Sequence, residues 1–424
     1  MSDICVKPAK LNGKVTAPPS KSDVHRAVIC AALSGGVCKI APVELSNDIK
    51  ATISCAQSLG AETTLRDNVL EVDGSGFLRK KTAALNCIES GSTLRFFVPI
   101  AAAGGVEAEF TGSGSLNSRP IGLFSQLLPE AGVSCETSGT LPLKISGQLM
   151  PGEFKVPGNI SSQFITGLLF ALPILNGDSR IVLTTKLESA GYIDMTINCM
   201  KRFGVEVKRT DYGWFIKGNQ SYKARDYRTE GDWSQAAFFM AAGAVSGDVE
   251  VNSVSLNSAQ GDKEIVNLLK RFGAEVEVKP DSVRVKKSAL RGIDIDAENI
   301  PDLVPILSVI AGCAEGVTNI FGAERLRIKE SDRLKTTADM LNSIGGKVEE
   351  KPDGLVIYGT GGFTGGKVNG SNDHRIVMSA SIAALRCRGE AVISDMESIN
   401  KSFPGYFGEY EKLGGMLCHF SAKK

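Results

Sequence analysis

Cationic and hydroxyl-bearing residues recur in this sequence where loops lead into apolar stretches. One stretch opens with Lys21, Ser22 and Arg26, another with Gly91 and Arg95, another with Ser161, Ser162 and Gln163, and the last with Arg375. Further basic residues follow in short loops: Arg119 in NSRPIG, Lys329 and Arg333 in RLRIKESDR, and Lys401 in INKSFPGYF. Helix N-termini carry unpaired N–H groups and partial positive charge, and Arg contacts carboxylate and phosphate groups in pairs. One such residue alone is usually a helix cap or a surface charge, but their recurrence predicts a ligand with several anionic groups.

Six repeats of about 70 residues must position these side chains. Each repeat begins with an apolar, Ala-rich stretch that is introduced by a polar residue and ends at glycine, which is the start and stop chemistry of a helix. The predicted cap positions are Ser20, Ser90, Ser161, Asp232, Asp302 and Asp373. A second helix follows in each repeat and is expected to end at Gly60, Gly132, Gly204, Gly273, Gly346 or Gly415. An alternating strand pair comes next in the first five repeats, so each repeat reads as strand, helix, strand, helix, hairpin.

The contrast between the first helices and the hairpins predicts an α/β fold with helices inside and sheets outside. The first helix of each repeat is apolar nearly all round and should be buried, whereas alternating hairpins can face water on one side. A chain of 424 residues is expected to form two domains. We expect three repeats in each, with residues 1–19 plus 231–424 in one domain and 20–230 in the other. A short N-terminal strand is expected to complete the domain that contains the last repeat.

Composition excludes several classes of function. Hydrophobic residues make up 42% and charged residues 22% of the chain, which is typical of a soluble globular protein. A formal net charge of +1 gives no bulk attraction to nucleic acid or to a membrane surface, and there is no long apolar span. The ten cysteines contain no C-x-x-C pair and read as thiols of a reducing cytosol. The three histidines lack metal-ligand spacing, so no metal is expected.

Eight segments together resemble, in order and spacing, the signatures of the 5-enolpyruvylshikimate-3-phosphate (EPSP) synthase family. They are PPSKSDVHRA, ESGSTLR, SRPIG, SSQF, IPDL, RIKESDR, NDHR and KSFPGYF, and they span essentially the whole chain. The resemblance implies a two-domain inside-out α/β barrel built from six units. It also implies a cytoplasmic monomer that joins phosphoenolpyruvate to shikimate 3-phosphate in the cleft between the domains, without a cofactor.

Matching these segments to the family assigns roles to individual residues. The shikimate 3-phosphate set that the resemblance implies is Lys21, Ser22, Arg26, Ser161, Ser162, Gln163, Ser189, Asp302 and Lys329. The phosphoenolpyruvate set is Lys21, Gly91, Arg119, Gln163, Arg333, Arg375 and Lys401. Glu89 and Arg325 depart from the pattern, since many family members have Asn at the first position and some have Asn at the second.

The implied reaction is an addition followed by an elimination, which needs a base, an acid and clustered cations. We expect Asp302 to act as the base and Glu330 as the proton donor, with Lys21 able to share either role. Domain closure would complete the site and exclude water. Gly91 is expected to leave the space that glyphosate-type phosphonates need.

Two other readings stay open at this stage. The related enolpyruvyl transferase that acts on UDP-N-acetylglucosamine shares the fold, but it typically carries a cysteine in the loop that here reads TGSGSLNSRPIG. A non-catalytic anion-binding scaffold is the alternative from a different class. The presence of Lys21, Asp302, Glu330 and Lys401 argues against it.

Overall fold

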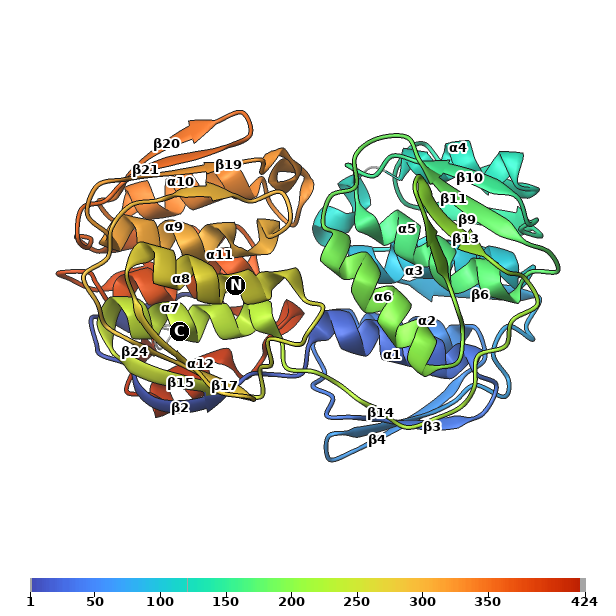
Figure 1. Ribbon diagram of the computed structural model, residues 1–424, viewed down its shortest axis with the longest axis horizontal. Coiled ribbons are helices and arrows are strands. Elements are labelled where there is room, and N and C mark those ends of the chain that lie inside the picture. The colour runs from blue at the N-terminus through green and yellow to red at the C-terminus, as the bar shows by residue number, and fades with distance from the viewer. Residues whose placement is uncertain (1, 120, 420–424) are drawn as a thin grey trace, which may run out of the picture. The chain divides into compact units, whose positions relative to one another are not determined.

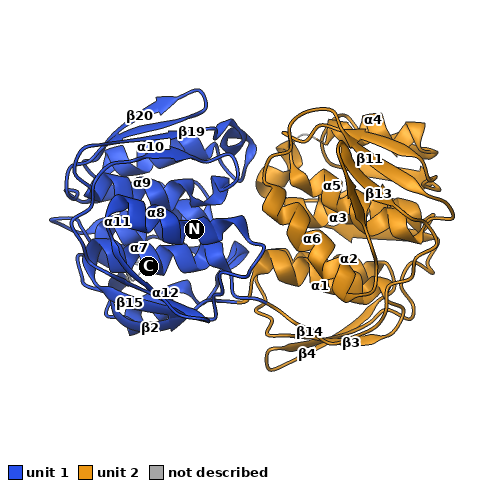
Figure 2. Cartoon of the chain, viewed as in Figure 1, with its two compact units in different colours: residues 1–18, 230–424 blue, residues 19–229 orange. Residues whose placement is uncertain are grey.

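The computed structural model describes residues 2–119 and 121–419, and its elements are shown in Figure 1. The chain divides into two compact units (Figure 2): residues 1–18 with 230–424 form unit 1, and residues 19–229 form unit 2. Each unit has its own hydrophobic core. Within the described residues, twelve α-helices accompany six four-stranded sheets, three sheets in each unit. None of these helices combines the length and apolar character that a membrane span needs.

The three sheets of unit 2 share one topology. The first repeat comprises β14 (Tyr227–Arg228), α1 (Lys21–Leu33), β3 (Val37–Ala41), α2 (Asn47–Ser58), β4 (Glu62–Arg66) and β5 (Val69–Asp73). The second comprises β6 (Thr82–Asn86), α3 (Gly91–Ala103), β7 (Glu107–Thr111), α4 (Gly122–Glu130), β8 (Val133–Glu136) and β9 (Leu143–Gly147). The third comprises β10 (Glu153–Val156), α5 (Ser162–Ala171), β11 (Ser179–Leu183), α6 (Ala190–Arg202), β12 (Lys208–Thr210) and β13 (Gly213–Ile216). In every sheet the first two strands are parallel and the hairpin is antiparallel, as in the order β6-β7-β9-β8.

Unit 1 repeats this topology. Its first repeat comprises β2 (Asn12–Thr16), α7 (Trp233–Ser246), β15 (Asp248–Asn252), α8 (Ile265–Phe272), β16 (Glu275–Val278) and β17 (Ser282–Lys286). The second comprises β18 (Asp294–Asp296), α9 (Val304–Cys313), β19 (Val317–Phe321), α10 (Arg333–Ser343), β20 (Lys347–Lys351) and β21 (Gly354–Tyr358). The third comprises β22 (Gly366–Val368), α11 (His374–Ala384), β23 (Ala391–Ile393), α12 (Tyr406–Lys412), β24 (Met416–His419) and β1 (Ile4–Lys7). Strand β1 pairs with β24 and β23, so the N-terminal segment supplies the strand that the last repeat lacks.

The chain crosses between the units at residues 18–19 and 229–230. Just before the first crossing, β2 pairs in parallel with β15, and just before the second, β14 pairs in parallel with β3. Each crossing strand therefore belongs to the sheet of the unit that the chain is leaving. The leading strand of each first repeat comes from a distant part of the sequence.

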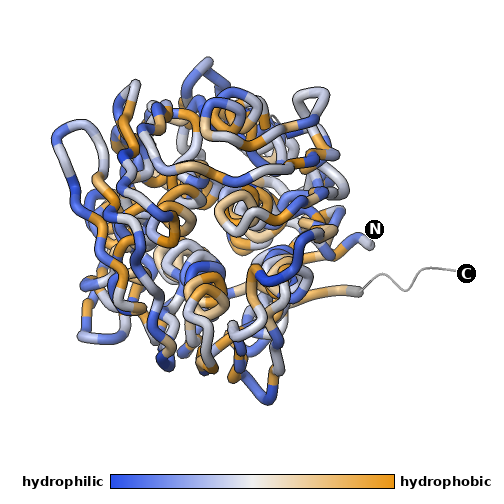
Figure 3. The backbone as a smooth tube through the Cα atoms, turned by 90° about the vertical axis from the view of Figure 1, so that its right-hand side faces the viewer, coloured by the Kyte–Doolittle hydropathy of each residue, from blue (hydrophilic) through white to orange (hydrophobic). Residues whose placement is uncertain are grey.

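Buried helices and outer hairpins confirm the predicted inside-out arrangement. Every residue of α7 is buried, and in unit 1 the helices α7, α9 and α11 pack against one another (Figure 1). The hairpin strands instead alternate, as in β16, where partly buried residues lie between exposed ones. Much of the hydrophobic colour in Figure 3 lies on the helices, whereas the outermost turns are mostly blue or white. Burying apolar helices removes the largest apolar area from water.

Five of the six predicted caps are confirmed, because Ser20, Ser90, Ser161, Asp232 and Asp373 each accept a hydrogen bond from a backbone N–H of the first helical turn. The sixth prediction was wrong: Asp302 lies in a 3₁₀ turn, η4 (Pro301–Leu303), and α9 begins after Leu303 without a side-chain cap. Pro305 removes one N–H that a cap would serve.

Two glycine predictions were wrong by one position. In each Gly-Gly pair the first glycine takes the left-handed conformation that ends the helix, with φ of +88° at Gly345 and +100° at Gly414. The predicted Gly346 and Gly415 come one residue later. The residue directly after the C-cap needs positive φ, and either glycine of a pair can supply it, so sequence alone cannot choose between them.

Candidate active site

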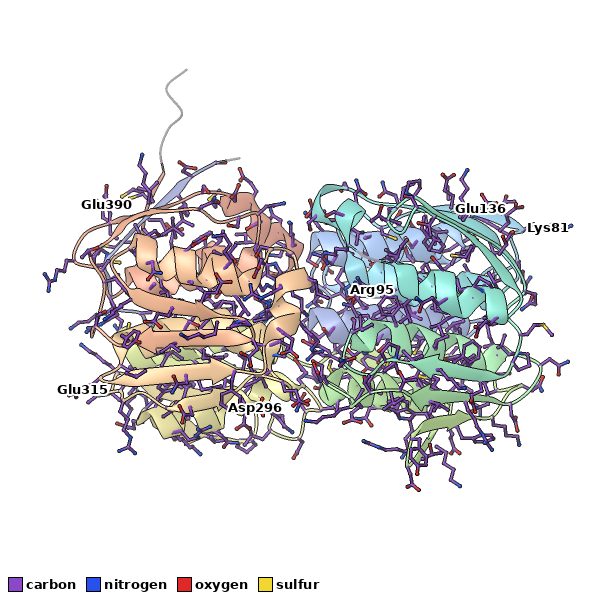
Figure 4. All side chains as sticks on the ribbon, turned by 90° about the horizontal axis from the view of Figure 1, so that it is seen from above. Lys81, Arg95, Glu136, Asp296, Glu315 and Glu390 are labelled. Atoms are coloured by element: carbon purple, nitrogen blue, oxygen red, sulfur yellow. The ribbon has the colours of Figure 1, made fainter. Side chains whose placement is uncertain are left out.

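Three side chains of unit 2 surround the start of α3. A Cβ atom on Gly91 would lie 2.7 Å from Arg95 Nη1, 2.9 Å from Arg119 Nη1 and 3.8 Å from Gln163 Oε1. Arg95 Nη1 donates to Gln163 Oε1 over 2.8 Å, and Gln163 Nε2 donates to Ser92 Oγ over 2.8 Å. Figure 4 shows Arg95 among the helices of unit 2, away from Lys81 and Glu136 at the rim. Two guanidinium groups beside a helix N-terminus suit a small anion, and the missing Cβ of Gly91 lets both groups approach the helix start.

Lys21 is held at the start of α1 by a residue that the sequence analysis did not single out. Its Nζ donates to Oδ2 of Asp48 over 2.7 Å, and both side chains are largely buried. Asp48 lies in the first turn of α2, which Ser46 caps. The sequence signal for Asp48 is its place in the first turn of a helix that Ser46 caps.

Arg26 lies within unit 2 between α1 and α6. Its guanidinium donates to the carbonyl oxygens of Ser22 and Tyr192 over 2.6 and 2.9 Å and to Thr196 Oγ1 over 2.9 Å. It also lies over the Phe96 ring, 5.5 Å from the centroid. Burial lowers the pKa of Arg26. Arg26 thus ties the segment around Ser22 to the first turn of α6.

The predicted serines gather at the starts of two neighbouring helices. Ser161 caps α5, Ser162 is its first residue, and Ser189 precedes α6 with φ of +53°. The segments before these helices are joined, since Glu188 N donates to Gly158 O over 3.1 Å and Asn159 N donates to Thr185 Oγ1 over 3.2 Å. Hydroxyl groups and helix N–H groups at one place suit a phosphate.

Arg333 is the centre of a buried ion cluster in unit 1. Its guanidinium contacts Asp302 Oδ1 at 2.9 Å, Asp373 Oδ2 at 2.8 Å and Glu330 Oε2 at 2.6 Å. Burial alone would lower the pKa of Arg333, but the charges of Asp373, Glu330 and Asp302 outweigh burial and raise it. Removing one partner of such a cluster leaves a buried charge uncompensated.

Other cations also approach Asp302. Arg375 Nη1 donates to the Asp302 carbonyl over 3.0 Å, and Arg375 Nη2 lies 3.5 Å from Asp302 Oδ2 while donating to Ser234 Oγ over 2.9 Å. Lys329 Nζ lies 3.9 Å from Asp302 Oδ1, and burial lowers the pKa of this lysine. Lys401 Nζ donates to the carbonyl of Asn372, just before α11, over 2.7 Å. An incoming anion therefore has to compete with the carboxylate, carbonyl and hydroxyl oxygens that these cations contact.

A further buried carboxyl lies in the same electrostatic environment. Asp262 belongs to η3 (Gly261–Glu264), which packs against α7. Burial, followed by the charge of Asp302, raises the pKa of Asp262 to about 8. Asp262 therefore holds a proton more readily than an ordinary carboxyl does.

Glu89 and Arg325, the two residues that depart from the family pattern, both contact other parts of the protein. A Cβ on Gly114 would lie 1.9 Å from Glu89 Oε1, so Glu89 folds against η1 (Gly114–Ser118), the turn that precedes Arg119. Arg325 Nη2 donates to the carbonyl of Glu298 over 2.7 Å. The structure thus gathers Gly91, Arg119 and Gln163 in unit 2, and Asp302, Lys329, Glu330, Arg333 and Arg375 in unit 1.

Known proteins of the same kind were found by sequence and by structure. A sequence model of the family "EPSP synthase (3-phosphoshikimate 1-carboxyvinyltransferase)" matches residues 5–410. A 3-phosphoshikimate 1-carboxyvinyltransferase of Clostridium novyi is 46% identical, with 100% of both chains covered, and one of Clostridium beijerinckii is 45% identical, with 98% of both covered. An EPSP synthase structure from Acinetobacter baumannii superposes with a TM-score of 0.85 at 27% identity, covering 99% of this chain and 100% of the other. The enolpyruvyl transferase NikO of Streptomyces tendae shares the fold, with a TM-score of 0.81 at 16% identity and 99% of both chains covered.

The fold is that of the enolpyruvyl transferases, two three-repeat units with ionic groups at their helix starts. Within that class, the chain belongs to the EPSP synthase family and is an enzyme of enolpyruvyl transfer in the shikimate pathway. These comparisons confirm the family, the fold class and the activity predicted from the sequence.

Proposed function

We propose that the chain transfers the enolpyruvyl group of phosphoenolpyruvate to the 5-hydroxyl of shikimate 3-phosphate. The hydroxyl oxygen attacks C2 of phosphoenolpyruvate while a proton reaches C3, which gives a tetrahedral intermediate. The C2–O bond to phosphate then breaks, C3 returns a proton, and inorganic phosphate leaves. The observation that carries this proposal is the Asp302 carboxylate, held within 4 Å of three cations. A base and its compensating charges therefore occur together.

In this proposal shikimate 3-phosphate is bound mainly by hydroxyl groups at helix starts. The adjoining starts of α5 and α6 support phosphate contacts for Ser161, Ser162 and Ser189. Ser22 and Arg26 are proposed to contact the sugar acid, with Arg26 giving up one of its backbone partners. Asp302 and Lys329 are proposed to hold its ring hydroxyls.

Phosphoenolpyruvate is proposed to be bound by cations from both units. Gly91, Arg119 and Gln163 supply one group, and the gathering around Gly91 supports it. The other group is Arg333, Arg375 and Lys401 from unit 1, with Lys21 shared between the two substrates. We propose that closure of the units around the substrates brings these groups together and removes water, which strengthens every charge interaction.

The proposed acid–base roles fall on residues of the ion cluster. Asp302 is proposed as the base, and it must exchange Arg333 for the substrate hydroxyl, while the carboxylate of phosphoenolpyruvate takes over Arg333. Glu330 is proposed as the proton donor, with Lys21 able to share either role. Preformed cations around the intermediate are proposed to provide most of the rate enhancement. No cofactor has a part in this proposal.

The proposal includes a cytoplasmic monomer, with the two substrates as its small-molecule partners. Sedimentation analysis of the purified chain tests the monomer. It also includes inhibition by glyphosate-type phosphonates, because the missing Cβ of Gly91 lets Arg95 and Arg119 lie close to the helix start, where they would meet a phosphonate.

Phosphate release measured with both substrates tests the proposed reaction. We expect release only when phosphoenolpyruvate and shikimate 3-phosphate are both present, and a new enolpyruvyl ether on the 5-oxygen. Replacing shikimate 3-phosphate by UDP-N-acetylglucosamine is the matched control. Release with UDP-N-acetylglucosamine but not with shikimate 3-phosphate would assign the chain to enolpyruvyl transfer to UDP-N-acetylglucosamine. If neither acceptor gave phosphate release, the non-catalytic anion-binding scaffold would be the remaining alternative.

A further inference from the structure

A buried chain of hydrogen bonds runs through unit 2 across three helices. His25 Nδ1 lies 2.6 Å from Thr52 Oγ1, Thr52 Oγ1 lies 2.7 Å from Thr93 Oγ1, and Thr93 Oγ1 donates to Ser90 Oγ over 2.7 Å. All four residues are at most 1% exposed. They come from α1, α2 and α3 and from the N-cap of α3. A fully buried polar chain that crosses three elements holds them at one spacing, because each break leaves a polar group unpaired.

The hydrogen bond between His25 and Thr52 joins α1 to α2 one helical turn away from the ion pair between Lys21 and Asp48. Lys21 and His25 are four residues apart on α1, and their partners Asp48 and Thr52 are four residues apart on α2. Residues four apart lie one above the other on the same helix face. The contact between His25 and Thr52 therefore lies directly inward of the ion pair between Lys21 and Asp48.

The far end of the chain lies at the start of α3. Ser90 Oγ caps this helix by accepting from Thr93 N over 3.2 Å, and Thr93 Oγ1 donates to the same oxygen. Ser90 directly precedes Gly91, whose neighbours are Arg95, Arg119 and Gln163. The hydrogen bonds therefore connect α1, one turn after Lys21, with the helix start that carries Gly91.

The direction of the hydrogen bonds determines the tautomer of His25. Thr93 donates its one hydroxyl proton to Ser90, so its oxygen must accept the hydrogen bond from Thr52. Because Thr52 then donates its own hydroxyl proton to Thr93, it must accept from His25. The Nδ1 atom of His25 therefore carries the proton. In the part of the chain that the structure describes, the buried Nε2 has no hydrogen-bond partner, and the imidazole meets the Phe96 ring edge-on, with centroids 6.3 Å apart.

We infer that His25 and Thr52 are positioning residues for catalysis, which keep the starts of α1 and α3, and with them Lys21 and Gly91, at one fixed separation. This inference rests on the proposed function, in which Lys21 and Gly91 contact phosphoenolpyruvate. A shift of about 1 Å at such a site can cost roughly 100-fold in rate. The binding of phosphoenolpyruvate is expected to suffer first, because Gly91 and Lys21 both belong to its proposed site.

Steady-state kinetics of the full chain test the inference with one substitution and two controls. Thr52→Val keeps the shape and removes the hydroxyl, and we expect the KM for phosphoenolpyruvate to rise about fivefold or more, with lower kcat. Thr52→Ser keeps the hydroxyl and should stay within about twofold of wild type in both constants. Thr318→Val changes an equally buried threonine in β19 of unit 1, whose hydroxyl accepts from Ile293 N, and should have no effect on them. Equal losses in Thr52→Val and Thr52→Ser, or wild-type constants in Thr52→Val, would overturn the inference, whereas absence of wild-type turnover would sink the proposed function itself.

The imidazole ¹⁵N chemical shifts give a second readout that does not need an active variant. With three histidines in the chain, the His25 signals are assigned as those lost in His25→Gln. We expect the Nδ1–H tautomer in the wild type, and a shift toward the Nε2–H tautomer in Thr52→Val. An Nε2–H tautomer in the wild type would refute the chain of hydrogen bonds, even if Thr52→Val failed to fold.

Discussion

Arg333 donates a hydrogen bond to Asp302 over 2.9 Å, and this ion pair joins the proposed base to a proposed ligand of phosphoenolpyruvate. Each residue keeps the other charged in a buried place, where a lone charge would be costly. In the proposed reaction the two substrates replace both halves of the pair: the carboxylate of phosphoenolpyruvate takes over Arg333, and the 5-hydroxyl of shikimate 3-phosphate turns to Asp302. The ion pair would then link substrate binding to release of the proposed base.

Removing the carboxylate of Asp302 tests its role as the base. Asp302→Ala should lower kcat by about 10²–10⁴, the usual contribution of general base catalysis, while binding of shikimate 3-phosphate is weakened but measurable. Phosphate release and calorimetric titration measure the two effects. Asp302→Asn controls for the lost hydrogen bond and should be equally inactive. Turnover within tenfold of wild type would show that another group is the base.

Adding a methyl group at Gly91 should discriminate between phosphoenolpyruvate and a phosphonate inhibitor. The new Cβ would meet Arg95 Nη1 at 2.7 Å and Arg119 Nη1 at 2.9 Å, so both guanidinium groups must move. Overpacking of this size costs about 1–3 kcal/mol, which is roughly a 5- to 150-fold change. We expect Gly91→Ala to raise the inhibition constant of glyphosate more than the KM of phosphoenolpyruvate.

Gly122→Ala is the matched control for Gly91→Ala. Gly122 is likewise the first residue of a helix, α4, and a Cβ there has nothing within 4 Å. Its kinetic constants should equal those of the wild type. The same inhibition constant in wild type and Gly91→Ala would contradict the assignment of this space to the phosphonate.

The charge of Asp373 should matter for stability more than its capping role. Asn caps a helix as well as Asp does, but Asp373→Asn leaves Arg333 with one fewer buried counter-ion. Breaking a buried pair costs about 3–5 kcal/mol, so thermal unfolding should begin several degrees lower. Asp332→Asn changes another Asp cap, whose ion pair with Arg327 is partly exposed, and should cost less than about 1 kcal/mol. Equal melting temperatures of the two variants would contradict the prediction.

Asp262 should make the protein less stable as pH rises. Its pKa is raised to about 8 in the folded protein, above its ordinary value of 3.8, so the folded state binds more protons between these values. Its contribution to stability is therefore full below pH 3.8 and is lost progressively up to about pH 8, by about 1.4 kcal/mol per pH unit. Asp262→Asn should raise the melting temperature more at pH 8 than at pH 5. A constant difference between those pH values would refute a raised pKa.

His25 should have the opposite effect at acid pH. Burial, helped by the charges of Lys21 and Arg26, lowers the pKa of His25 well below 6.5, so the unfolded chain binds the extra proton. Stability from this group is full above about pH 6.5 and falls by about 1.4 kcal/mol per pH unit below it. The melting temperature of the wild type should drop faster than that of His25→Gln between pH 6.5 and 5. Parallel curves would show that His25 titrates normally.

Local sequence rules were sufficient to predict the helices and sheets of this protein. Helix caps such as Ser20 and Asp373 follow from hydrogen bonds within one turn, and the repeat of six capped apolar helices predicts six sheets around buried helices. The same rules failed at Asp302, where a distant arginine holds the carboxylate in place of the helix start. They also could not choose between neighbouring glycines such as Gly345 and Gly346.

What the sequence by itself determined is therefore the repeat, the helix starts and the residue types found there. Only the tertiary structure decided the partners: Asp48 for Lys21, Thr52 for His25, and Arg95 and Arg119 beside Gly91. The physical reason is the distance along the chain over which each interaction acts. Capping and periodicity act within one or two turns of chain, whereas Lys21 and His25 meet their partners only after two helices separated by a strand have packed.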